Sequence, residues 1–313
     1  NTVSKTWVIQ NNAGYQVTIS QGTGANVVIP NGGIKMLVTD GAGAGAAVTD
    51  VLDMTGGTGN VGLGSGSLGT AMTTGTNNVA VGENALDAFT TGSDNVAVGD
   101  AAAGVLTTGS NNVAIGTNAL DANTTGGSNI AIGLDALGGN TTADSNIGIG
   151  RGALYVNTSG ADNVAVGRGS LAANTTASNN TAIGRSSLAA NTTGTPNTAV
   201  GYGAATANTT GENIVAVGYN ALAANTTGTS NVAVGYGALD ANTTANSNTA
   251  IGTVALGANT TGTGSAAVGA NALDANTTGN YNVAVGQHAL GKNTTGANNI
   301  GIGYGSLSEI LTV

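Results

Sequence analysis

β-Branched residues occupy alternate positions, with small residues between them, in a hydrophobic motif that recurs between polar turns along most of the chain, as in the tetrapeptides VAVG and VAIG that end at Gly82 and Gly116. Such alternation is typical of β-strands, so a short strand is predicted before each closing glycine, here called the marker glycine. The markers recur every 17 residues without a single insertion, since 303 − 82 = 221 = 13 × 17, and Gly64 ends one degenerate copy. The regular markers are Gly82, Gly99, Gly116, Gly133, Gly150, Gly167, Gly184, Gly201, Gly218, Gly235, Gly252, Gly269, Gly286 and Gly303.

Residues one period apart form columns, and the composition of a column indicates what its position faces. The position before the marker is always Val or Ile, and the position four after it is nearly always Leu, so we expect these two columns to form the core. The column two before the marker holds only Ala and Gly. A face open to water would accept Thr, Ser or Lys, so we expect a sister chain to pack closely on the strands. The predicted trimer-packing residues are Ala80, Ala97, Ala114, Ala131, Ala165, Ala182, Ala199, Ala216, Ala233 and Ala250.

The period also predicts the architecture. Alternating β-branched residues, frequent glycine and recurrent Asn-Thr-Thr-Gly turns exclude helix. We therefore predict an all-β fold, a parallel β-solenoid or β-roll of 17-residue coils, in which each coil hydrogen-bonds only to its neighbours. Residues 61–307 are assigned to the repeats, 55–60 to a glycine-rich joint and 308–313 to a C-terminal cap.

The first 54 residues have a different pattern. Alternating apolar residues predict short strands at 7–10, 15–20, 26–29 and 34–39, separated by Gly, Asn and Pro turns. This spacing predicts a small β-sandwich or barrel in front of the repeats. Which strand face would line an interface between chains stays open at this stage.

Composition excludes several classes of function. Charged residues make up 7% of the 313-residue chain, against about 25% in ordinary globular domains, and the net charge of −9 disfavours nucleic acid as a partner. The absence of cysteine excludes disulfides and thiolate metal sites. No stretch approaches the ~18 apolar residues of a membrane span. We expect no cofactor, no bound metal and no enzymatic activity.

Two resemblances follow from these motifs. The repeat Asn-Asn-Val-Ala-Val-Gly, with Ala-Leu after it, resembles the repeats in the head domains of trimeric autotransporter adhesins, which are homotrimeric parallel β-rolls. Residues 18–32 and 37–48 resemble a small β-domain of bacteriophage tail fibre proteins. The stalk and membrane anchor of such adhesins are not recognisable in this sequence, so we favour the tail fibre. The resemblance implies an extracellular, homotrimeric virion fibre for host attachment, with other tail proteins and host surface polysaccharide or lipopolysaccharide as partners.

One column departs from the rest in a way that the fold does not require. The position after the marker holds three consecutive arginines and then three consecutive tyrosines, where Thr would serve equally well. Guanidinium groups bind phosphate or carboxylate, and phenol rings stack on sugar faces, so the column is a candidate site for an acidic surface glycan. The residues are Arg151, Arg168, Arg185, Tyr202, Tyr219 and Tyr236, named here the Arg–Tyr column.

Other chemistry has weaker support. Glu83 and Asp100 share a column in adjacent repeats, as a polysaccharide depolymerase would need, while His288 alone offers little for nucleophilic catalysis. Asp240 and Asp274 are spaced too widely for a calcium loop. The Asn-Thr-Thr turns predict a hydrogen-bonded ladder, against the alternatives of ice binding and glycosylation. Two alternative functions therefore remain. One is a polysaccharide depolymerase tailspike, and the other is a secreted fibre that serves as an adhesin, as a structural element or in ice binding.

Overall fold

A computed structural model describes residues 5–19, 27–29, 34–39, 48–54, 59–69 and 73–308. The chain divides into two compact units, Asn1–Ser145 and Asn146–Val313, each considered by itself below. The described part contains strands and turns and no helix. Much of the predicted 55–60 joint and of the 308–313 cap lies outside the described residues.

The first unit begins with five strands of mainly antiparallel pairing. β1 pairs with β4, β4 with β5 and β2 with β3, around buried Val27, Ile29 and Leu37. The four strands predicted here are confirmed within two or three residues, whereas the fifth was not foreseen from the sequence. It pairs antiparallel with the first solenoid strand through Asp53 and Gly62. The five strands are β1 (Lys5–Gln10), β2 (Val17–Ile19), β3 (Val27–Ile29), β4 (Ile34–Thr39) and β5 (Val48–Met54).

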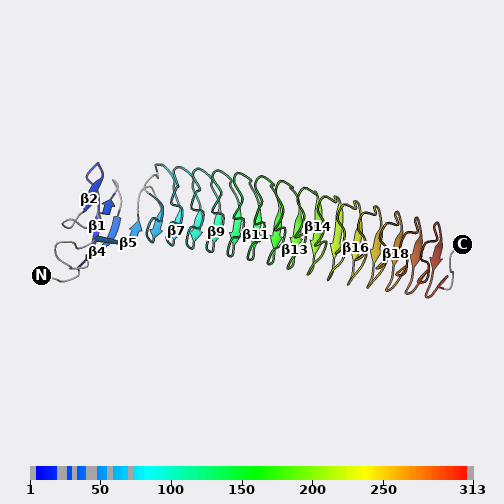
Figure 1. The fold of residues 1–313 in the computed structure, drawn as a ribbon. Coiled ribbons are helices and arrows are strands. Elements are labelled where there is room, and N and C mark those ends of the chain that lie inside the picture. Colours follow the sequence, from blue (N-terminus) through cyan, green and yellow to red (C-terminus); the bar gives the residue numbers. More distant parts are fainter. Residues whose placement is uncertain are drawn as a thin grey trace. The chain divides into compact units, whose positions relative to one another are not determined.

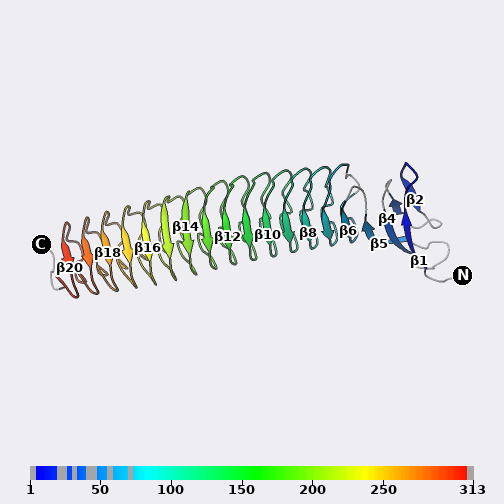
Figure 2. The same ribbon diagram turned by 180° about the vertical axis from the view of Figure 1, so that it is seen from behind.

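Both units contain coils of a parallel β-solenoid, about 14 in all with about 17 residues per turn, which confirms the predicted all-β parallel solenoid. In the first unit the coil strands are β6 (Val61–Leu63), β7 (Val79–Val81), β8 (Val96–Val98), β9 (Val113–Ile115) and β10 (Ile130–Ile132). In the second unit they are β11 (Ile147–Ile149), β12 (Val164–Val166), β13 (Thr181–Ile183), β14 (Asn197–Val200), β15 (Ile214–Val217), β16 (Val232–Val234), β17 (Thr249–Ile251), β18 (Ala266–Val268), β19 (Val283–Val285) and β20 (Ile300–Ile302). Figures 1 and 2 show β11–β20 side by side from opposite directions.

The interior of a coil is narrow and is filled by small, apolar and amide side chains. The alanine column and the leucine column both point inward, and their members are almost completely buried. The Val and Ile on either side of each alanine point outward and are half-buried or exposed, as for Ile183 and Ile251 at 40% exposure each. The predicted leucine core is therefore confirmed, while the predicted β-branched core is wrong. In the coil that starts at β16, the inward residues are Ala233, Ala238, Leu239, Asn242, Ala245 and Asn248.

Close approach of the opposite wall explains why the alanine column accepts only Ala and Gly. Gly301 belongs to this column, and a Cβ there would lie 2.9 Å from Leu290 Cγ and 3.3 Å from the Ser306 carbonyl oxygen. A longer side chain would collide with the wall of its own coil. This corrects the expectation that Ala80, Ala165 and the rest of the column pack on a sister chain, because their methyl groups have no accessible surface in the single chain.

Candidate functional site

The arginines of the Arg–Tyr column stand at the carboxyl ends of three adjacent strands. Arg151, Arg168 and Arg185 each follow the marker glycine after β11, β12 and β13, and all three side chains are exposed. These strands pair in parallel register, so the arginine Cα atoms are spaced by about 4.8 Å. The structure thus brings together the three residues that the sequence predicts as one basic strip.

The tyrosines continue this column, but their rings are arranged differently from the sequence-based expectation. Tyr202 and Tyr219 are stacked with centroids 5.2 Å apart and planes 9° apart, and Tyr219 and Tyr236 with centroids 5.3 Å and planes 6° apart. Both faces of the Tyr219 ring are therefore turned toward neighbouring rings. The prediction that a sugar stacks on the face of each phenol ring is therefore wrong, because the ring edges and hydroxyls face the solvent instead.

The strip carries positive charge that the described part of the chain does not neutralise. None of the three guanidinium groups forms an ion pair with a described carboxylate, and the Arg185 Cζ lies 5.6 Å from the Tyr202 ring centroid. That cation–π contact ties the strip to the tyrosine stack. Three of the six cationic residues of an acidic chain thus stand in one column. Their mutual repulsion would be relieved by a bound anion.

The carboxylates considered for catalysis lie in open positions. Glu83 and Asp100 occupy successive coils of the first unit, and both side chains are exposed. A general acid in a glycosidase needs an enclosed environment, and these exposed positions do not supply one.

A second acidic column is partly buried. Burial raises the pKa of Asp121, Asp240 and Asp274, and hydrogen bonds from backbone N–H groups oppose this shift. Within the described residues no three His, Cys, Asp or Glu side chains gather closely enough to hold a metal ion. The column therefore gives no support to a metal site.

The Asn-Thr-Thr turns form the predicted ladder. Asn123 is fully buried, its Nδ2 donates to the Gly126 carbonyl at 2.8 Å, and Asn140 Nδ2 donates to the Asn123 Oδ1 at 3.2 Å. Thr124 Oγ1 donates to the Thr141 carbonyl one coil later at 3.2 Å. The ladder is confirmed, and a buried asparagine of this kind is not accessible for glycosylation in the folded chain.

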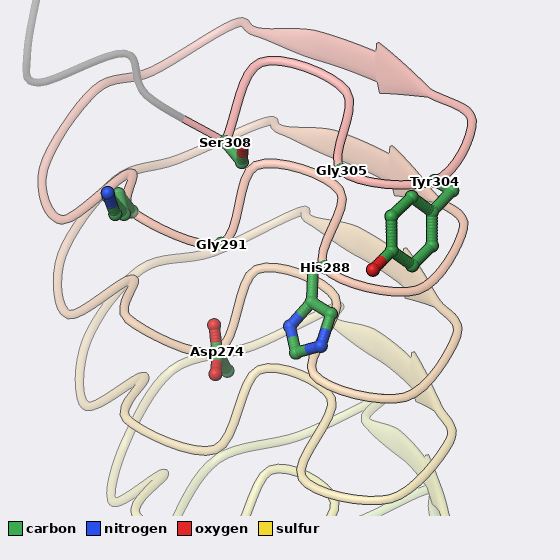
Figure 3. A pocket seen from close by; sticks show the side chains of 7 residues that line it. Asp274, His288, Gly291, Tyr304, Gly305 and Ser308 are labelled. Atoms are coloured by element: carbon green, nitrogen blue, oxygen red, sulfur yellow. The ribbon is translucent and has the colours of Figure 1, made fainter.

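One cluster escaped the sequence analysis. His288 lies with Asp274 and Tyr304 around a hollow near the end of the second unit, as Figure 3 shows. The three residues come from different columns of three successive coils, so periodicity alone gives no signal that connects them. His288, the one histidine of the sequence, was the only available sign, because Asp and Tyr each recur at other positions of their columns.

Comparison with known proteins gives no match, whether the chain is set against protein-family models, curated proteins or solved structures. Among the residues that the structure describes, no helix has the length and apolar character needed to cross a bilayer.

Proposed function

We propose that this chain is a non-catalytic structural segment of a virion tail fibre that attaches to an acidic cell-surface glycan. The resemblance of the repeats to adhesin heads and of residues 18–32 and 37–48 to a tail fibre domain supports the fibre class. In-register coils suit this role, because each unit holds its surface side chains at a fixed repeat.

The Arg–Tyr column is the observation that carries the attachment role. The Cα atoms of its three exposed arginines repeat at about 4.8 Å, and no described carboxylate pairs with their guanidinium groups. Each guanidinium can donate two parallel hydrogen bonds to a carboxylate or phosphate of a glycan. The tyrosine hydroxyl edge adds neutral hydrogen-bonding groups beside the strip. Shallow sites of this kind bind weakly one by one and gain affinity by multivalency.

Binding of immobilised heparin and polygalacturonate, with dextran as a neutral reference, tests this role. Replacing Arg151, Arg168 and Arg185 by Thr, which the same column holds at Thr117 and Thr253, should abolish binding to both anionic polymers and remove its salt dependence. The triple Arg→Lys variant keeps the charge without the planar donor pair and should retain weaker, salt-sensitive binding. Unchanged binding by the Arg→Thr variant would place attachment elsewhere.

Assembly as a homotrimer is part of the proposal, through the outward strand face and not through the alanine column. In β11–β20 the two outward positions that flank each Ala or Gly hold only Val, Ile, Thr or Ala, without a charge. Exposed β-branched residues in this number favour burial against an apolar partner. A second copy of the chain offers the same uncharged surface at the same repeat distance, so copies of this chain are the occupants that we propose.

Light scattering tests the assembly. The pair Ile183→Lys and Ile251→Lys should convert a trimer into monomers with unchanged far-UV circular dichroism, because both side chains point outward. The pair Thr193→Lys and Thr261→Lys adds the same charge to the same two coils at other exposed positions and should leave the trimer intact. A wild-type chain that stays monomeric, or a trimer that survives the isoleucine substitutions, would contradict this interface.

A further inference from the structure

A hollow of about 360 Å³ opens on the surface of the last coils of the second unit. Asp274 follows β18, His288 and Gly291 follow β19, and Tyr304 and Ser308 follow β20, so the hollow spans three successive coils. Figure 3 shows the imidazole below the Tyr304 ring, with the Asp274 carboxylate across the hollow. Its volume lies at the low end of the range for ligand pockets, about 300–1,000 Å³, and suits a small ligand.

Glycines keep the hollow open. A Cβ on Gly291 would lie 3.4 Å from Asp274 Oδ1, in contact with the carboxylate, and its absence leaves that oxygen accessible. Gly305 stands one coil after His288 in the same column, and a Cβ there would have only Ser308 Oγ near it, at 4.0 Å. The space above Gly305 is therefore free for a ligand.

The hollow combines an aromatic wall with hydrogen-bonding groups. The His288 and Tyr304 rings meet edge to face, with centroids 6.3 Å apart and planes 87° apart. Tyr304 is 80% exposed, so much of its ring is available for contact. The Asp274 carboxylate accepts hydrogen bonds and the Ser308 hydroxyl can donate or accept them. Lys292 adds an ammonium group to the lining.

These groups discriminate between classes of ligand. A metal ion would need more ligands, and the described residues hold no group of three that could bind one. A phosphate or carboxylate would be attracted by Lys292 but repelled by Asp274, so these two charges offset each other. A pyranose ring satisfies the whole set, because its hydroxyls donate to the carboxylate while its C–H face packs on the aromatic edge and ring. We propose that this hollow binds one pyranose unit of a neutral glycan, independently of the Arg–Tyr column.

Saturation-transfer-difference NMR tests the site with methyl glucoside, methyl galactoside, methyl mannoside and N-acetylglucosamine as probes. At least one probe should show transfer to the wild-type chain at millimolar concentration, as expected for one shallow sugar site. Replacing Tyr304 by Thr and Asp274 by Ala uses residues that the same columns already hold at Thr253 and Ala223. Either change should weaken binding of that probe by about tenfold or more.

Two controls distinguish binding at this site from non-specific binding and from binding at the Arg–Tyr column. Tyr155→Ala removes another exposed tyrosine, in a column that holds Ala172, and should leave the sugar signal unchanged. The triple Arg→Thr variant of the Arg–Tyr column should also keep the sugar signal. The two proposed sites can therefore fail independently of each other. The proposal is overturned if no probe gives a signal with wild type, or if the signal persists when Tyr304 and Asp274 are replaced together.

Discussion

The side chain of Asn225 donates a hydrogen bond from Nδ2 to Oδ1 of Asn208, the equivalent residue one coil earlier, at 2.8 Å, and both side chains are fully buried. The same Nδ2 donates to the Gly228 carbonyl at 3.0 Å, and Asn225 Oδ1 accepts from Asn242 at 2.8 Å. Each asparagine thus links one coil to the next while it closes its own turn. Buried amides in this column carry part of the cohesion that a larger apolar core would supply elsewhere.

Asn225→Ala should therefore destabilise the second unit by about 2–3 kcal/mol, because it leaves two buried acceptors without a partner and removes one of the two acceptors of Asn242 Nδ2. Chemical unfolding followed by far-UV circular dichroism measures the loss. Thr227→Ala, at an exposed position of the same turn, should change stability by less than about 0.5 kcal/mol. Equal midpoints for the two variants would show that the amide ladder contributes nothing to stability.

The marker glycines are expected to be irreplaceable for a backbone reason. Gly235 has φ +139°, and a Cβ there would lie 2.4 Å from the Gly252 carbonyl oxygen of the next coil, which cannot move away. Gly235→Ala should cost at least about 3 kcal/mol in the free energy of unfolding. Gly152→Ala is the matched control, since φ is +64° and no atom lies within 4 Å, and it should cost about 1 kcal/mol. Thermal unfolding midpoints of the two variants provide the comparison.

Ala165→Leu tests which way the alanine column faces. Because Ala165 is fully buried inside its own coil, the larger side chain should destabilise the isolated chain by about 1–3 kcal/mol or more, even at dilutions where no assembly forms. Val166 is the next residue in the sequence and points outward, so Val166→Leu should hardly change the free energy of unfolding. Loss of assembly by Ala165→Leu with unaltered stability of the single chain would instead place the column in an interface between chains.

Stability should depend on pH through the partly buried acidic column. Burial raises the pKa of Asp240 above its usual value, against hydrogen bonds from the Asp240 and Ala241 backbone. The folded chain therefore binds this proton more readily than the unfolded chain. Its contribution to stability is full below the unfolded pKa near 3.8 and is lost as pH rises through the raised value.

Asp240→Asn, which cannot ionise, should consequently be more stable than wild type at neutral pH, and the difference should shrink on acidification. The gain should stay below about 1 kcal/mol, because water screens a half-exposed carboxylate. Asp162→Asn removes an exposed carboxylate and is the control for the loss of one negative charge. Thermal melts of the three proteins across acidic and neutral pH measure the effect.

The sequence by itself determined the repeat, its strands and its turn ladder. A marker glycine every 17 residues requires identical coils, because one insertion would shift all later columns relative to their neighbours. The local backbone also requires glycine at the markers before the exposed Arg151 and Tyr202, because these markers have a positive φ, as at Gly150. Strand β5 was not predicted, because the apolar and polar residues of its sequence, VTDVLDM, do not alternate regularly.

Only the tertiary structure decided the direction of the two strand faces. Alternation separates Ala165 from its neighbours Val164 and Val166, but neither face carries a charge that would assign it to water. The narrow interior of the coil decides which face points inward, because at Gly301 even a Cβ would lie 2.9 Å from Leu290 Cγ and a larger side chain would collide with the wall. The self-stacked tyrosines and the hollow at His288 also depend on side-chain directions between coils, which no single column records.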